Sequence, residues 1–265
     1  METPSAMDAP FHYAEFDPAP DLARHVARYW VFRVRGAGAA HRLWPDACIS
    51  LALVPQPPMV SIVGPHLGPL DVAAGDGAVY WGARFWPDAG GVVLGIPATA
   101  VRDVNVRASP AVTLAFAPFF ERLRAGAMDE ASAAQLFDRI LRPLVVAARP
   151  IDDAVRRAVL AIMAGRGEQP ITAVALSIGL GERQLQRRFR IAVGLTPKQF
   201  ARIRRLRTAV GGLLGPEPAR WAEVAANLGY ADQSHLIHEF SQLTGLTPVA
   251  FEERLRHIQH GRVDP

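Results

Sequence analysis

Four polar side chains recur at the spacing of one helical face. Arg183, Gln186, Arg187 and Arg190 stand at positions i, i+3, i+4 and i+7, so a helix would present them in one row. Arginine and glutamine are the side chains that pair with the edges of guanine and adenine in the major groove of DNA. From Arg183 to Arg207 there are nine Arg or Lys residues and no Asp or Glu. Taken alone, the row is equally compatible with an ordinary solvated basic face.

The row lies inside a pattern that the chain contains twice, between Ile171 and Phe251. The first copy carries Val174, Ala175, Ile178, Gly179, Leu185, Phe189, Gly194, Leu195, Thr196, Pro197 and Phe200. The second copy carries, in the same order, Val224, Ala225, Leu228, Gly229, Leu236, Phe240, Gly245, Leu246, Thr247, Pro248 and Phe251. One extra residue at the turn is the single shift between them. So many ordered matches indicate a duplicated structural unit.

Each copy predicts two short helices joined by a tight turn. In the first copy, the apolar residues before Gly179 fall on one helical face, and glycine accepts the positive φ that ends a helix. A second helix is expected from about Glu182 to Gly194, with its apolar residues inward. In the second copy, Asp232 occupies the N-cap position of the corresponding helix. The pattern therefore predicts two helix-turn-helix units.

Residues 165–265 resemble the DNA-binding domain of the AraC/XylS family of bacterial transcription regulators. The second unit carries the family's hallmark at Val224-Ala225, Gly229-Tyr230, Asp232, Ser234-His235-Leu236, Phe240, Gly245 and Thr247-Pro248. The resemblance implies two units joined by a long helix, with recognition helices that enter successive major grooves. The base contacts that it implies come from Arg183, Gln186, Arg187, Gln233, Ser234, His235 and His238.

The second unit also departs from the family pattern. The family often has Arg and Lys where this chain has His238 and Ser241, which predicts a weaker grip on DNA by this unit. On the expected connecting helix, Arg202 and Arg205 are candidates for phosphate contacts or for structural roles. We count both, together with Arg190, among the expected DNA-binding residues.

The N-terminal half predicts many short strands punctuated by glycine and proline. The β-branched and aromatic runs that we expect as strands are residues 29–34, 48–54, 60–63, 70–72 and 79–86. Residues 21–28 predict a short helix, and residues 97–103 predict one helical turn. A series of short strands at this spacing is typical of a barrel or a sandwich. From Val112 onward the strand pattern stops, and three helices are expected before Gly165.

Part of this half resembles the cupin-like N-terminal domain of some members of the same regulator family. The resemblance is carried by Arg28-Tyr29-Trp30, Leu43-Trp44-Pro45-Asp46, Gly82-Ala83-Arg84-Phe85-Trp86-Pro87 and Leu94-Gly95-Ile96-Pro97. Its motifs are less specific than those of the C-terminal half. Such domains are thought to sense small molecules, so the resemblance implies an effector but cannot name it.

The candidate effector-binding residues are three tryptophans and one arginine. Trp44, Trp81 and Trp86 could line an apolar pocket, with Arg84 as an anchor for an anion. Aromatic residues at alternating positions of a strand are more often part of a core. Cys48 also has two interpretations, because it could be a buried core residue or a redox or alkylation sensor.

Composition and charge limit the class of protein. The chain has 265 residues, which favours two domains, and a net charge of +4. The charge is uneven, because residues 165–265 carry fourteen Lys or Arg against nine Asp or Glu. One cysteine excludes an internal disulfide and fits a reducing compartment. The chain has no signal-peptide pattern and no apolar run of membrane-spanning length, so a cytoplasmic location is expected.

The sequence carries none of the common enzyme motifs. The chain lacks a Ser-His-Asp order, a P-loop and a dinucleotide-binding fingerprint. Its N-terminal histidines are scattered without an H-x-H pair, so we expect no metal and no cofactor.

The sequence therefore predicts a two-domain α+β protein that regulates transcription. We expect a mostly-β, cupin-like barrel with flanking helices at 1–110, a helical linker or dimerisation region at 111–164, and an all-α DNA-binding domain at 165–265. The expected partner is double-stranded promoter or operator DNA, and further partners are a small-molecule effector, RNA polymerase and a second copy. One alternative is a small-molecule binding or modifying protein whose basic half contacts proteins. Another is a DNA-binding regulator whose N-terminal domain only dimerises.

Overall fold

The N-terminal half folds around an open β-sheet. The computed structural model describes residues 11–35, 41–72, 75–126, 128–213, 221–256 and 258–260. The strands of the main sheet lie in the order β8-β5-β4-β7-β2-β1-β9. They are β1 (Phe11–Phe16), β2 (Val26–Val34), β4 (Ser50–Val54), β5 (Met59–Val63), β7 (Val79–Phe85), β8 (Asn105–Arg107) and β9 (Ile258–His260). Adjacent strands are antiparallel except β1 and β9, which are parallel.

Most of the predicted strands are confirmed, but the barrel is not. The predicted runs coincide within a few residues with β2, β4, β5, β6 (Leu70–Val72) and β7, and β6 pairs with β3 (His41–Leu43) in a separate small sheet. Within the described residues, β8 and β9 are the two ends of an open sheet, so a cupin-like barrel is not confirmed. The helix predicted for 21–28 is wrong, because turns precede β2. The pairing of β2 with β7 outweighs the local helical pattern.

Helices follow the sheet and make up the C-terminal half. They are α1 (Gly90–Leu94), the 3-10 turn η1 (Ala98–Ala100), α2 (Pro110–Ala115), α3 (Ala117–Arg124), α4 (Glu130–Ala147), α5 (Asp153–Ala164), α6 (Ile171–Ser177), α7 (Glu182–Val193), α8 (Pro197–Leu213), α9 (Trp221–Asn227), α10 (Gln233–Thr244) and α11 (Pro248–Arg256). Within the residues that the structure describes, none of these helices has the length and apolar character needed to cross a membrane.

Aromatic side chains join the sheet to α3 and α4. Phe137 of α4 stacks on Tyr29 of β2, with ring centroids 4.7 Å apart. Phe119 of α3 meets Trp81 of β7 edge-on, with centroids 6.0 Å apart. All four side chains are buried. Large aromatic pairs of this kind stabilise a core through both buried area and ring geometry.

Helix α5 packs with the C-terminal helices. Its residues Val155 and Ile162 are buried in the same apolar cluster as Leu185 and Phe189 of α7. The apolar cluster that contains the sheet, in contrast, extends along the chain only as far as α4 and the segment just after it. We therefore propose that the C-terminal helical domain begins at α5, about twelve residues before the boundary expected at 165.

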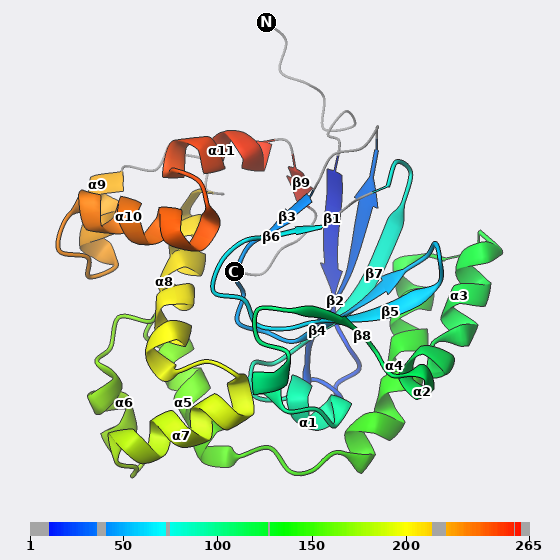
Figure 1. Ribbon diagram of the computed structural model, residues 1–265, viewed down its shortest axis with the longest axis horizontal. Helices are drawn as coiled ribbons and strands as arrows, with labels where there is room; N and C mark the ends of the chain where they lie inside the picture. Colours follow the sequence, from blue (N-terminus) through cyan, green and yellow to red (C-terminus); the bar gives the residue numbers. More distant parts are fainter. Residues whose placement is uncertain are drawn as a thin grey trace, which may run out of the picture.

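The two halves lie side by side (Figure 1). The sheet and α2–α4 occupy one side of the molecule, and α5–α11 occupy the other. Helices α7 and α10 lie near opposite ends of α8. Strand β9 follows α11 and brings the end of the C-terminal half back to the edge of β1.

Candidate nucleic-acid interface

The first predicted helix-turn-helix unit is formed by α6 and α7. Gly179 has φ 74°, which ends α6 and turns the chain, and the N–H of Leu180 donates to the Ala175 carbonyl. Helix α7 begins at Glu182 as expected and ends at Gly194, where φ is 81°. Its inward face is buried and packs on α8, the connecting helix.

The second unit repeats this arrangement with α9 and α10. Gly229 and Gly245 have φ values of 69° and 71°, so the helix ends match those of the first unit. The Asp232 carboxylate accepts a hydrogen bond from the His235 backbone N–H at 2.7 Å, which confirms the predicted N-cap. Phe240 of α10 packs edge-on against Phe251 of α11, with ring centroids 5.1 Å apart. The duplicated pattern is therefore a duplicated fold.

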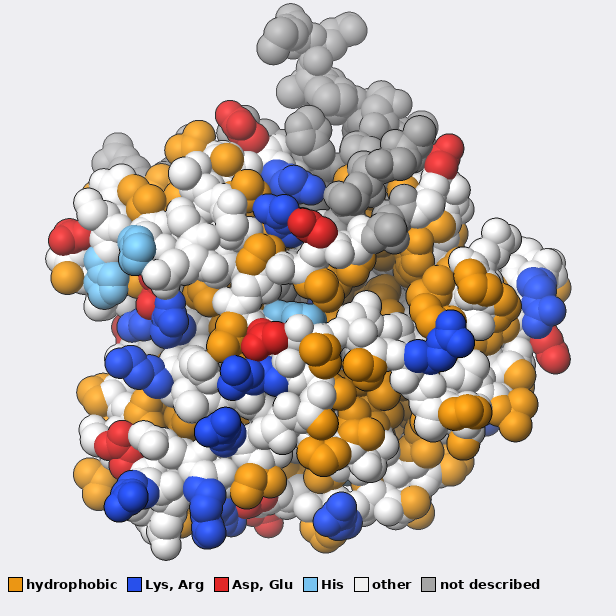
Figure 2. Space-filling view, viewed as in Figure 1, with side chains coloured by type: hydrophobic (Ala, Val, Ile, Leu, Met, Phe, Trp, Pro, Cys, Tyr) orange, Lys and Arg blue, Asp and Glu red, His pale blue; other side chains and the backbone are white. Residues whose placement is uncertain are grey.

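Both candidate recognition helices present their polar rows to solvent. The exposed side chains include the predicted rows, which are Arg183, Gln186, Arg187 and Arg190 on α7 and Gln233, Ser234, His235 and His238 on α10. Lys and Arg side chains gather over α6–α8, and histidines over α9–α10, on the face shown in Figure 2. The row of the first unit thus contains three arginines, whereas the row of the second unit contains histidines and no Lys or Arg.

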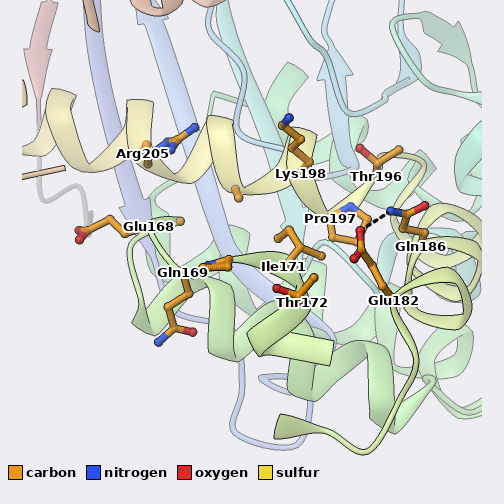
Figure 3. Close-up of a pocket in the computed structure, with 13 residues that line it drawn as sticks. Glu168, Gln169, Ile171, Thr172, Glu182, Gln186, Thr196, Pro197, Lys198 and Arg205 are labelled. Atoms are coloured by element: carbon orange, nitrogen blue, oxygen red, sulfur yellow. Dashed lines mark hydrogen bonds between the residues drawn. The ribbon is translucent and has the colours of Figure 1, made fainter. Parts of the chain in front are cut away.

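A hollow of about 530 Å³ lies beside the N-terminal end of α7 (Figure 3). The chain before α6, the start of α7 and the start of α8 surround it, and Lys198 and Arg205 contribute cationic side chains. On its wall, the Gln186 amide donates to the Glu182 carboxylate at 3.0 Å. The bond uses one N–H of the Gln186 amide, so the second N–H and the carbonyl oxygen can still pair with a base.

Glu239 connects α8 to the second unit. Its carboxylate accepts from Arg202 Nε at 2.9 Å, from the Tyr230 hydroxyl at 2.8 Å and from Arg205 at 3.4 Å. The Arg205 guanidinium also lies 5.2 Å from the centre of the Tyr230 ring. Because Arg202 also donates to Gln242 of α10, both arginines face the protein. These contacts favour the structural interpretation of Arg202 and Arg205 over the phosphate interpretation.

An ion pair fixes α7 against the start of α5. Arg188 donates to both carboxylate oxygens of Asp152, at 2.8 Å and 2.5 Å. The same carboxylate caps α5 by accepting from the N–H groups of Ala154 and Val155. These bonds, led by those from Arg188, hold the pKa of Asp152 below its ordinary value of 3.8.

Replacing Asp152 by Asn is expected to lower stability in a pH-dependent way. Asparagine keeps the cap but loses the charge. Because solvent at the Arg188 side chain screens the ion pair, we expect the free energy of unfolding to fall by less than about 1 kcal/mol. Because the folded pKa is depressed, the contribution of Asp152 is fully present above pH 3.8 and disappears as the pH falls through the folded value. Thermal unfolding of the variant and the parent chain from about pH 6 down to pH 3 measures whether the difference between their stabilities disappears.

Asp153 provides the matched control for this change. It is the next residue, and its ion pair with Arg24 is exposed at both side chains. Asp153→Asn is therefore expected to leave stability unchanged across the same pH range. A stability difference between Asp152→Asn and the parent chain that stays constant down to pH 3 would contradict the assignment.

The four candidate effector residues have different neighbours in the structure. Trp81 is buried in the core of the sheet, and Trp44 packs on Phe251 of the second unit with ring centroids 4.4 Å apart. The indole N–H of Trp86 donates to the Ala23 carbonyl. Arg84 pairs with Glu15 at 2.7 Å and with Asp46 at 3.1 Å. The proposal of an effector pocket at Trp44, Trp81, Arg84 and Trp86 therefore stays a prediction.

Cys48 lies next to this charged group. It is buried, and burial raises the pKa of its thiol well above the ordinary range. A thiol held protonated in this way reacts slowly, which favours the core interpretation over the sensor interpretation.

Glu239 and Glu182 are site residues that were not predicted, although the sequence contains a signal for each. Glu239 stands on the inward stripe of α10, at i+3 from Leu236 and directly before Phe240. A carboxylate on an apolar stripe needs a basic partner, and the connecting helix is rich in arginine. Glu182 precedes Gln186 by one helical turn, the spacing at which side chains on a helix interact.

Two sequence families match the chain. Residues 166–254 match the family described as "Helix-turn-helix domain", and residues 14–107 match a "Domain of unknown function (DUF6597)". Among curated proteins, none is significantly similar to the chain.

Solved structures with a similar arrangement include three of ToxT from Vibrio cholerae. An apo ToxT variant is 8% identical, with a TM-score of 0.48, and the match covers 85% of this chain and 97% of that one. ToxT from strain O395 is 10% identical, with a TM-score of 0.43 and coverage of 93% and 98%. Wild-type ToxT bound to an unsaturated fatty acid is 7% identical, with a TM-score of 0.41 and coverage of 92% and 93%.

Proposed function

We propose how individual residues of this chain act on DNA. The chain carries an AraC-type helix-turn-helix domain and is thereby a DNA-binding transcription regulator. In the proposal, α7 and α10 enter successive major grooves on one face of a promoter duplex, and α8 sets their separation. The observation that carries it is the exposure of two polar rows on the equivalent helices of two equivalent units. Each helix buries its apolar face within its own unit and presents its polar row to solvent.

The two units have different parts in this proposal. Arg183, Gln186 and Arg187 read bases, because arginine and glutamine match the edges of guanine and adenine. Arg190, one turn further along α7, contacts phosphate. In the second unit, Gln233, Ser234, His235 and His238 lack a fixed positive charge, and we propose that this unit contributes base preference more than affinity.

Effector control is the second part of the proposal. The N-terminal domain contacts both units, through Ala98 and Pro65 at the end of α7 and through Trp44 at Phe251. A small molecule that binds this domain can therefore alter the placement of the units. A domain that only dimerises would leave DNA affinity independent of any metabolite, and titration of metabolites into a DNA-binding assay separates these cases.

Replacing Arg187 by Ala is expected to weaken binding to a selected duplex by roughly 1–3 kcal/mol and to relax the base preference at one position. The physical reason is the loss of a paired hydrogen bond to one base edge. The measurement is a binding isotherm on a duplex that the parent chain selects from a random library, followed by selection with the variant.

Arg139 on α4 provides the control for Arg187. Its side chain is exposed, and it lies on the helix that packs against the sheet. Arg139→Ala is expected to bind the same duplex with unchanged affinity. If Arg187→Ala weakens binding equally on every sequence, Arg187 contacts phosphate and the proposed base contact is wrong.

A further inference from the structure

His238 of the second recognition row shares a hydrogen bond with the residue one helical turn later. Its ring Nε2 atom lies 2.8 Å from the amide nitrogen of Gln242, and both side chains are exposed. An amide nitrogen donates and does not accept, so Nε2 of His238 is the acceptor in this bond. A neutral imidazole carries one proton, and that proton is then on Nδ1.

The orientation of the Gln242 amide is fixed by Arg202 of α8. A half-turn exchanges the oxygen and the nitrogen of an amide, and an imidazole can pair with either atom. A guanidinium cannot, because it donates and never accepts. Arg202 donates to the Gln242 carbonyl oxygen at 2.9 Å, so the amide nitrogen is the atom that faces His238.

Arg202 is in turn held by a buried carboxylate. Its Nε donates at 2.9 Å to Glu239, and hydrogen bonds between two charged groups are stronger than those between neutral groups. The Tyr230 hydroxyl donates to the same carboxylate, and the Tyr230 ring packs edge-on against His235 with ring centroids 5.4 Å apart. Both histidines of the row are thus connected to Glu239.

The position of the proton decides which base edges His238 can pair with. With Nε2 engaged and Nδ1 protonated, the ring offers a donor and no acceptor. In the major groove guanine presents two acceptors, N7 and O6, whereas cytosine presents an amino donor. A fixed donor therefore favours guanine and opposes cytosine. An imidazole that is free to move its proton between its two nitrogens would make a weaker distinction.

We propose that Gln242, held by Arg202, is a positioning residue that keeps His238 in the Nδ1–H tautomer and thereby makes it a reader of guanine. The proposal rests on the proposed function, because it assigns a chemical preference to one residue of the second recognition row. It also gives a physical reason why a row without Lys or Arg can contribute base preference. The direction of its hydrogen bond is set before DNA arrives, so less ordering is needed on binding.

The position of the proton can be measured on the free chain. Nitrogen NMR of protein labelled at histidine, recorded at about pH 8.5 where a free imidazole is neutral, distinguishes a protonated from an unprotonated ring nitrogen. The signals of His238 are those that His238→Ala removes. We expect its proton on Nδ1 in the parent chain. In Gln242→Glu the new carboxylate only accepts, so we expect Nε2 to carry a proton. A parent ring that carries its proton on Nε2, or shares it equally between both nitrogens, would overturn the proposal.

Base selection tests the consequence for DNA. Duplexes selected from a random library by the parent chain and by His238→Ala identify the position that His238 reads, and we expect guanine there. The parent chain is expected to bind this duplex at least about 5-fold more tightly than a duplex with cytosine at that position, and Gln242→Met is expected to reduce the ratio below about 2-fold. Methionine matches glutamine in helix propensity but cannot donate to the ring. The matched control is Gln233→Met on the same helix, which is expected to keep the ratio at this position.

Other results of the selection would also overturn the proposal. One is a Gln242→Met variant that keeps the full ratio. Another is a variant that loses preference at a different position, because Gln242 would then read a base itself. A parent chain that prefers cytosine at the position of His238 would contradict the assigned donor. If the parent chain selects no duplex at all, the proposed function fails, whereas the proton position measured on the free chain still decides whether Gln242 positions His238.

Discussion

Replacing Glu239 by Ala lowers the free energy of unfolding of the C-terminal helices by about 3 kcal/mol. The carboxylate is the shared acceptor for Arg202, Arg205 and Tyr230, and its own side chain is only 9% exposed. Without it, a hydroxyl and two partly buried guanidinium groups lose their acceptor, which costs more than the mean value of one hydrogen bond. Urea unfolding followed by helical circular dichroism measures the shift of the midpoint.

Two further variants test whether the loss arises from the shared acceptor at Glu239. Tyr230→Phe removes one donor and leaves both arginines paired, so a smaller loss of about 1.5 kcal/mol is expected. Glu253, an exposed carboxylate on α11, provides the control, and Glu253→Ala is expected to leave the midpoint unchanged. If Glu239→Ala were as stable as Glu253→Ala, Arg202 and Arg205 would be available for phosphate, and their structural role would be wrong.

Replacing Asp88 by Ala is expected to destabilise the chain by about 3–5 kcal/mol. Asp88 is fully buried, and its partner Arg156 is only 12% exposed. The guanidinium also donates to the Arg24 carbonyl and lies 5.7 Å from the centre of the Trp86 ring, so it cannot turn to solvent without losing these contacts. Thermal and urea unfolding of the whole chain measure the loss.

A double replacement distinguishes charge burial from a general loss of packing. Asp88→Leu with Arg156→Met removes both charges and keeps apolar volume, so most of the stability is expected to return. The exposed pair of Asp21 and Arg142 serves as a control, because Asp21→Ala is expected to have no measurable effect. A double variant as unstable as Asp88→Ala would contradict the ion-pair explanation.

The helix-turn-helix units could be predicted closely because their signals are local. Gly179, Gly194, Gly229 and Gly245 all end helices with positive φ, as the repeated pattern required. Asp232 caps α10 through a bond only three residues away. Caps and helix stops depend on neighbours within one turn, so the sequence alone contains the information needed to place them.

The rest of the fold depends on residues that are distant in the chain. Strand β1 pairs with β9 across most of the sequence, and no local pattern at Ile258 predicts a partner at Phe11. The ion pair of Arg156 with Asp88 and the packing of Trp44 on Phe251 are equally non-local. The proposed effector residues could not be placed from the sequence either. Alternating aromatic residues indicate burial, but they do not indicate which face of the sheet a cavity adjoins.

Strand β9 has a consequence for the chain as a whole. It covers the outer hydrogen-bonding edge of β1, and an uncovered strand edge is a template on which another polypeptide can add a strand. Deleting Ile258–His260 would therefore bare this edge of β1. A strand of another molecule can then add to the bared edge and link the two chains through their sheets.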